Sequence, residues 1–188
     1  MSMRELSRYG VTAGAFALSV LVGAVSASAQ SKPPELGSPV SAAELAAWDL
    51  SIGPAGRELP AGGGTVAEGE AVYTRACASC HGAKGVGKPN DALVGGRDSL
   101  KGPAPALKTV GSYWPYATSV FDYIRRAMPI TAPQSLSNDE AYAVTAYILQ
   151  LNGLVDANIR LDAKSLAAVT MPNRDGFKSL LPAGRPAP

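Results

Sequence analysis

The two cysteines of this 188-residue chain, Cys77 and Cys80, are separated by two residues, and the only histidine, His81, follows directly. The order Cys-x-x-Cys-His is that of a covalent attachment site for c-type haem. Two thiols add to the two vinyl groups of one porphyrin edge, and the imidazole reaches the iron from the same short helical turn. The pentapeptide therefore predicts a domain folded around one covalent haem c, with Cys77 and Cys80 as thioether links and His81 as an iron ligand.

Three other readings of the cysteine pair are weaker. A dithiol redox centre needs a thioredoxin-like strand and helix, but the residues before Cys77 look helical and no βαβ pattern is present. A structural zinc site needs four ligands, and the sequence offers no second Cys or His pair. A disulfide between Cys77 and Cys80 closes a very small ring and leaves His81 without a role.

The first 29 residues have the pattern of a secretory signal peptide. Arg4 and Arg8 form a basic start, Val11 to Val25 is apolar, and Ala27-Ser28-Ala29 fits the small-residue cleavage rule. An uncleaved anchor is the alternative, although this apolar stretch is shorter than the roughly 20 residues that span a bilayer. We expect cleavage before Gln30 and a periplasmic protein, which agrees with the attachment of c-type haem outside the cytoplasm.

Charge and composition exclude one class of partner. The chain carries 17 basic and 15 acidic side chains, and an apolar fraction of 46% fits one globular domain. So small a net charge argues against nucleic-acid binding. The 20 glycines and 15 prolines predict short helices and much irregular chain.

We therefore expect an all-α fold in four parts. Residues 1–29 are the signal peptide, and 30–64 are an N-terminal extension with a short helix from Ser41 to about Trp48. Residues 65–153 form the haem domain, with short helices wrapped around the cofactor and long irregular loops. Residues 154–188 are a C-terminal extension, expected to lie over the domain surface as a tail.

Capping patterns locate the helices of the haem domain. Thr65–Glu68 is a capping box that opens the helix carrying the haem motif, and Gly82 ends that helix. Residues 88–117 lack periodicity and predict a long irregular segment. Helical character returns over 118–127 and ends before Pro129. A further capping box, Ser137–Glu140, opens an amphipathic helix over 138–151, followed by Gly153 as its C′ residue.

The second iron ligand is expected to be Met128. A His/Met pair is typical of electron-transferring cytochromes c, and Met1 and Met3 are lost with the signal peptide. Met128 ends a short helix and precedes Pro129, whose fixed backbone favours a rigid loop. Met171 is the weaker candidate, because it lies in the expected tail. Either methionine can instead fill a gap in the core, and an open or water-bound sixth position is the remaining alternative.

Supporting residues are harder to assign. The free ring N–H of a ligand imidazole normally donates to a carbonyl, and Pro89 or a neighbour is the candidate. Several residues are candidates to hydrogen-bond the haem propionates, although the aromatic residues can equally be core and the arginines a solvated face. These candidates are Tyr113, Trp114, Tyr116 and either Arg125 or Arg126.

Together, Cys77–His81, Met128-Pro129 and the last amphipathic helix resemble a class I cytochrome c over residues 65–152. Longer strings resemble the cytochrome subunit of the Sox-type sulfur-oxidation system, which is the partner of a molybdenum-cofactor sulfane or sulfite dehydrogenase. These strings are Ile52–Pro60, Lys108–Tyr116, Phe121–Pro129, Ala132–Leu136 and Met171–Phe177. Fuller members of that family are two-haem chains, whereas this sequence has a single Cys-x-x-Cys-His motif.

The resemblance implies a one-haem subunit or carrier that accepts single electrons from a molybdenum-dependent dehydrogenase. It would pass them to a downstream cytochrome or oxidase. A generic electron shuttle without a dedicated partner would differ from such a subunit only in how tightly it binds the proteins that exchange electrons with it. The alternative from another class is a haem enzyme that acts directly on a small substrate through a displaceable sixth ligand.

Overall fold

The computed structural model describes residues 36–178 and residue 180, so the expected signal peptide lies outside the described residues. The chain divides after Ser41 into two units, and the second contains all the described helices and strands. The described part of the first unit, residues 36–41, is exposed and non-helical. In the second unit, helix α2 (Ala42–Trp48) is the short helix expected before the haem domain.

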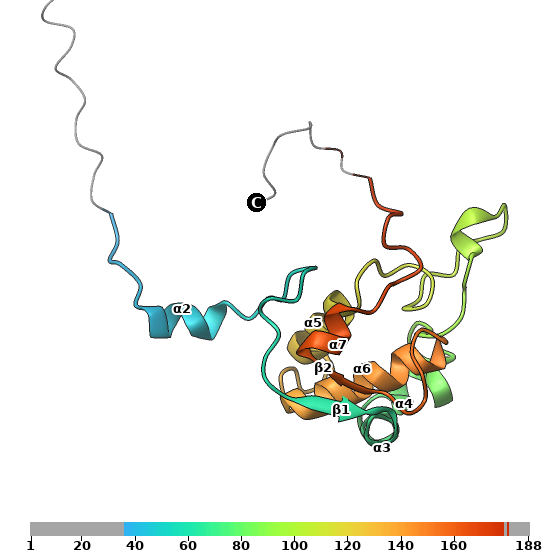
Figure 1. The fold of residues 1–188 in the computed structure, drawn as a ribbon, viewed down its shortest axis with the longest axis horizontal. Helices are drawn as coiled ribbons and strands as arrows, with labels where there is room; N and C mark the ends of the chain where they lie inside the picture. Colours follow the sequence, from blue (N-terminus) through green and yellow to red (C-terminus); the bar gives the residue numbers. More distant parts are fainter. Residues whose placement is uncertain (1–35, 179, 181–188) are drawn as a thin grey trace, which may run out of the picture. The chain divides into compact units, whose positions relative to one another are not determined.

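Two helices cross at the centre of the second unit. Helix α3 (Val66–Ala76) packs against α6 (Asn138–Leu151), and α6 also contacts helix α5 (Ala117–Ala127). In Figure 1, α3 is seen end-on while α6 runs across the view. The capping boxes predicted at Thr65–Glu68 and Ser137–Glu140 are both present, because each cap side chain accepts from the backbone N–H three residues on.

The helix that carries the haem motif is interrupted, contrary to the expectation of one continuous helix. Cys77 has a non-helical backbone (φ −125°, ψ −35°) between α3 and the single turn α4 (Ala78–His81). The amides of Cys80 and His81 both donate to the carbonyl of Cys77, which closes this turn. Gly82, at φ +74°, ends α4 as predicted. Two short 3-10 turns follow, η1 (Ala83–Gly85) and η2 (Ser99–Lys101).

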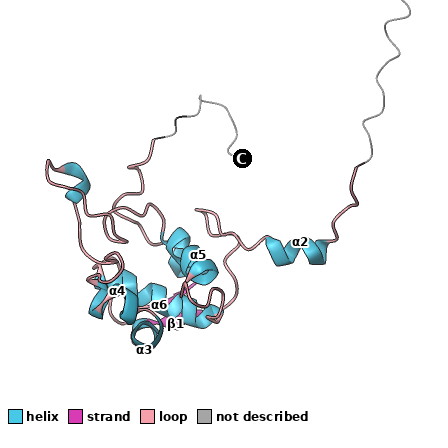
Figure 2. Ribbon diagram, turned by 180° about the vertical axis from the view of Figure 1, so that it is seen from behind, coloured by secondary structure: helices cyan, strands magenta, loops and turns pink. Residues whose placement is uncertain are grey.

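The described residues also contain a two-stranded antiparallel sheet, which was not predicted from the sequence. Strand β1 (Gly63–Thr65) pairs with β2 (Arg160–Asp162), with Gly64 opposite Leu161. Figure 2 shows how little strand the fold contains beside its helices. A Cβ atom at Gly64 would collide with the backbone of Ala143 on α6, so glycine allows β1 to lie directly on that helix.

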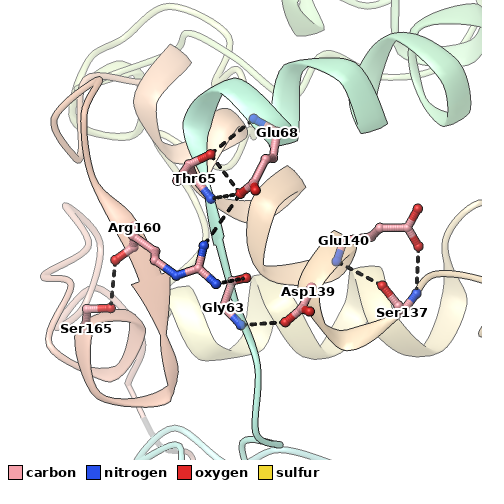
Figure 3. A network of polar contacts seen from close by, with 8 residues as sticks. All are labelled: Gly63, Thr65, Glu68, Ser137, Asp139, Glu140, Arg160 and Ser165. Carbon is pink, nitrogen blue, oxygen red and sulfur yellow. Dashed lines mark hydrogen bonds and ion pairs between the residues drawn. The ribbon is translucent and has the colours of Figure 1, made fainter.

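A polar network joins this sheet to the starts of α3 and α6 (Figure 3). The amide of Gly63 donates to Asp139 on α6 (2.8 Å), and Arg160 on β2 donates to the carbonyl of Gly63 (2.8 Å). Arg160 also lies 3.7 Å from the carboxylate of Glu68. The network therefore fixes the chain before α3 to the chain after α6.

The C-terminal segment is part of the core up to Met171, and our expectation of a surface tail is wrong for these residues. Leu161 on β2, Leu166 on helix α7 (Ala163–Ala167) and Met171 are all buried in the same cluster as the residues of α5 and α6. Helix α7 also contacts α5. Asp162 and Ser165 form its capping box, a signal that was available in the sequence.

Candidate functional site

The four residues predicted to hold the cofactor line one cavity. Cys77, Cys80 and His81 reach it from the α3–α4 region, and Met128 reaches it from the end of α5. Apolar side chains of α5 and α6 form much of the wall, including Val120, Ile124, Val144 and Ile148. One imidazole, one thioether and two thiols are thus gathered around a largely apolar space.

The imidazole of His81 is oriented by the loop that follows it. Its Nδ1 lies 2.9 Å from the carbonyl oxygen of Asp91. Because a carbonyl can only accept, Nδ1 carries the proton and Nε2 keeps a lone pair for a metal. The expected partner was the carbonyl of Pro89 or a neighbour. The partner in the structure is the carbonyl of Asp91, two residues beyond Pro89.

Backbone hydrogen bonds hold this loop in place. The amide of Gly87 donates to the carbonyl of His81 (2.8 Å), and the amide of Asn90 donates to that of Cys80 (2.8 Å). Tyr73 on α3 donates its hydroxyl to the carbonyl of Gly82 (2.9 Å), and its own side chain is buried. The imidazole of His81 therefore sits in a segment with little freedom to rotate.

Met128 is positioned by the end of α5. Its amide donates to the carbonyl of Ile124 (3.0 Å), and its backbone then becomes extended. A turn follows in which Ala132 donates to the carbonyl of Pro129 (2.9 Å). Met171, the other candidate, is buried in the core and does not line this cavity. Its position is that of a core-filling methionine.

The environment of Cys77 is that of a structural thiol. Cys77 and Cys80 are both free, and burial raises the pKa of the Cys77 thiol to about 11. A redox-active dithiol needs a thiolate stabilised near neutral pH, so the environment of Cys77 disfavours that reading. Within residues 36–178, no group of three Cys, His, Asp or Glu side chains is arranged to bind a metal ion, which also disfavours a zinc site.

Of the residues proposed to bind propionates, the structure brings Trp114 to the cavity wall, where its ring packs against Tyr123 at 5.7 Å between ring centroids. Arg126 instead forms an ion pair with Asp122 (2.7 Å), and Arg125 donates to Asn138 (3.1 Å). The two arginines line a separate polar pocket.

Several wall residues were not identified from the sequence: Leu93, Tyr123, Ile130, Thr131 and Leu136. They come from loops or, for Tyr123, from the partly exposed side of α5. The four loop residues carried no periodic signal, whereas Tyr123 follows Val120 at i+3 on α5 and could have been placed with it on the cavity side.

Comparison with known proteins defines the class of the protein. Residues 64–148 match the family described as cytochrome c oxidase, cbb3-type, subunit III. A search of curated proteins found no match. The chain is therefore similar to c-type cytochromes in the region that contains the cavity.

A solved structure defines the family more closely. The chain is similar to one from the crystal structure of the sulfane dehydrogenase SoxCD from Paracoccus pantotrophus, with 42% identity and a TM-score of 0.72. The match covers 77% of this chain and 71% of the other. The protein belongs to the family of c-type cytochromes that includes the cytochrome subunit of Sox-type sulfane dehydrogenase.

Proposed function

We propose that the protein is a one-haem, electron-transferring cytochrome c exported to the periplasm through residues 1–29. The observation that carries this proposal is the convergence of Cys77, Cys80, His81 and Met128 on one largely apolar cavity. The residues fit the group, because two thiols, an imidazole and a thioether are the donors that c-type haem requires. Haem bound there supplies the exchange of single electrons between Fe(II) and Fe(III).

Each residue has a separate task in this proposal. Cys77 and Cys80 form the thioether links, and His81 offers Nε2 because Nδ1 is held by Asp91. Met128 would provide a second ligand to the iron, and its sulfur would favour a higher reduction potential than a nitrogen ligand. The apolar side chains of α5 and α6 keep water away from the group and so help to set that potential.

The lining of the cavity favours a carrier over a haem enzyme. Among the described residues that line it, none is a carboxylate, lysine or arginine. Proton transfer to a bound substrate most often depends on histidine or on carboxylate and lysine side chains. His81 is assigned to the iron, which leaves Tyr123 as the one ionisable side chain among the described lining residues that is not assigned to the haem. If Met128 also holds the iron, a substrate would have to displace it.

We further propose that the electron donor is the molybdenum-cofactor subunit of a sulfite or sulfane dehydrogenase, and that a downstream cytochrome or oxidase is the acceptor. Similarity to a chain of SoxCD supports this choice. The cavity rim includes Ile130, 67% exposed, and Tyr123, 44% exposed, which gives a partner an apolar surface close to the cofactor. In the described part of the chain, no helix has the length and apolar character to cross a membrane.

The ligand assignment is tested by mass and visible spectroscopy of protein purified after export. We expect the polypeptide mass plus one haem, with colour retained after denaturation. Met128→Ala should lose the red-end absorption band of thioether-bound iron, whereas Met171→Ala should keep it. A colourless product contradicts the whole proposal, and loss of the band in Met171→Ala contradicts the choice of Met128.

The electron-transfer role is tested by mixing the oxidised protein with a purified molybdenum sulfite or sulfane dehydrogenase and its substrate. We expect haem reduction that requires both the dehydrogenase and the substrate. Reduction by the sulfur compound alone, together with rapid binding of added cyanide to the iron, would favour the haem enzyme.

A further inference from the structure

The sequence string Met171–Phe177 has no task in the proposed function, yet it lies against the loop that borders the cofactor cavity. We call residues 171–177 the C-terminal arm and residues 113–116 the aromatic loop. The arm is anchored at Met171, which is only 2% exposed. The residues after Met171 leave the core, and three of them contact the aromatic loop.

Side chains of the C-terminal arm contact the aromatic loop on both sides of Trp114. Asn173 donates its side-chain amide to the carbonyl of Tyr113 (2.7 Å). The ring of Phe177 meets the ring of Tyr113 edge-on, with centroids 5.3 Å apart. Arg174 lies over the ring of Tyr116, 5.3 Å from its centroid.

Trp114 and Pro115 lie between these two contact points, and Trp114 lines the cavity. Its ring packs on Tyr123 from α5. The backbone on either side therefore determines how firmly the indole closes this part of the wall. A wall that admits more water changes the polarity around a redox group, and the reduction potential follows.

Asn173 is held in its orientation by its own turn. The amide of Gly176 donates to the carbonyl of Asn173 (3.0 Å), and the amide of Arg174 donates to that of Met171 (3.2 Å). A Cβ atom at Gly176 would collide with the side chain of Asn173. Glycine at this position therefore leaves the amide free to reach Tyr113.

We propose that Asn173 is a positioning residue that fixes the aromatic loop through the carbonyl of Tyr113 and so holds Trp114 in the wall of the cofactor cavity. The inference rests on the proposed function only in taking the cavity as the haem site. Asn173 itself touches neither the cavity nor the four proposed haem-binding residues. Its effect is transmitted by the loop.

The test replaces Asn173 by leucine, which has a similar size and no charge but cannot donate a hydrogen bond. The matched control is Asn158→Leu, the same change at an exposed asparagine earlier in the C-terminal segment. Gly176→Ala is a second variant, which displaces the Asn173 side chain without changing it. All are made in the full chain, exported and purified with haem bound.

Two readouts are measured on each protein. Amide hydrogen exchange of the aromatic loop should become about fivefold faster in Asn173→Leu, the factor expected from one lost hydrogen bond. The midpoint reduction potential should shift in both Asn173→Leu and Gly176→Ala and stay at the wild-type value in Asn158→Leu. The red-end thioether band should remain in all four proteins, because Met128 is not disturbed.

Unchanged exchange and an unchanged potential in Asn173→Leu would overturn the proposal, and so would equal changes in Asn158→Leu. Faster exchange with no shift in potential would overturn the link to the cavity. If Asn173→Leu does not fold, Gly176→Ala decides between these outcomes. Failure of the proposed function is distinguishable, because the wild-type protein would then lack covalent haem.

Discussion

Gly69 is the residue at which α3 and α6 come closest. A Cβ atom there would overlap the backbone carbonyl of Ala143 and lie 2.9 Å from Cβ of Tyr147. Space rather than backbone conformation therefore requires glycine. Because α3 leads into the haem motif, this contact also sets where Cys77 and His81 meet the wall that α6 provides.

Gly69→Ala tests this close approach. The added methyl group must push two helix backbones apart, and overpacking of this kind costs about 1–3 kcal/mol in the free energy of unfolding. Chemical denaturation of the haem-bound protein measures the loss. Gly102→Ala is the matched control, because a Cβ at Gly102 meets nothing within 4 Å. Equal stability of both variants would show that the crossing tolerates a wider spacing.

At this scale the sequence was informative wherever the chemistry belongs to a side chain. The spacing of Cys77, Cys80 and His81, and the helix-ending position of Met128, were sufficient to predict a group of residues that the structure gathers around one cavity. The partner of His81 could not be predicted, since every residue has a carbonyl. Which one is in reach depends on a loop with positive φ at Gly82, Gly85 and Gly87.

The elements were predictable where a local signal starts or stops them. The capping box at Ser137–Glu140 predicted α6 with the bounds that the structure shows, Asn138–Leu151, and Gly153 follows at φ +65°. The sequences of the two strands contain no such signal. Each strand has three residues, too few for an alternating pattern, and β1 contains two glycines.

Ser137→Ala tests the contribution of the cap to α6. The hydroxyl accepts from the amide of Glu140 (3.2 Å), and the loss of such a cap costs about 1 kcal/mol. The change in the free energy of unfolding is measured by chemical denaturation. Ser51→Ala, at an exposed position outside the helices, serves as control. A variant as stable as this control would mean that packing alone defines the start of α6.

For the molecule as a whole, stability should fall at high pH because of buried tyrosines. Burial raises the pKa of Tyr73 and of Tyr142 to about 12, from about 10 in an unfolded chain. Both hydroxyls donate hydrogen bonds, to Gly82 and Pro60 respectively (2.9 Å each), and an ionised oxygen cannot donate. Their contribution is fully present below pH 10 and is lost as the pH rises toward 12.

The folded state then holds more protons than the unfolded state, so the free energy of unfolding declines with pH. Each tyrosine adds a slope of up to about 1.4 kcal/mol per pH unit in this window. Denaturation of the wild type, Tyr73→Phe and Tyr142→Phe between pH 9 and pH 12 measures the slopes. Each variant should show a shallower decline than the wild type, and equal slopes in all three proteins would contradict the prediction.

The long-range part of the fold was the least predictable. Leu161, Leu166 and Met171 are buried in the core, but their five-residue spacing matches neither the helical nor the strand period. Their burial depends on β2 meeting β1, and nothing local in either segment encodes that encounter. Hydrophobic periodicity therefore predicts the helices around the cavity, but it does not predict that residues 160–171 complete the core.

The pairing of Gly64 with Leu161 also sets an order of events while the protein is being made. Synthesis proceeds from the N-terminus, so both cysteines have left the ribosome long before Arg160–Asp162 exist. Until Arg160–Asp162 have been synthesised, β2 cannot pair with β1. If export proceeds in the same direction, both thiols reach the compartment where haem is attached before β1 and β2 can pair.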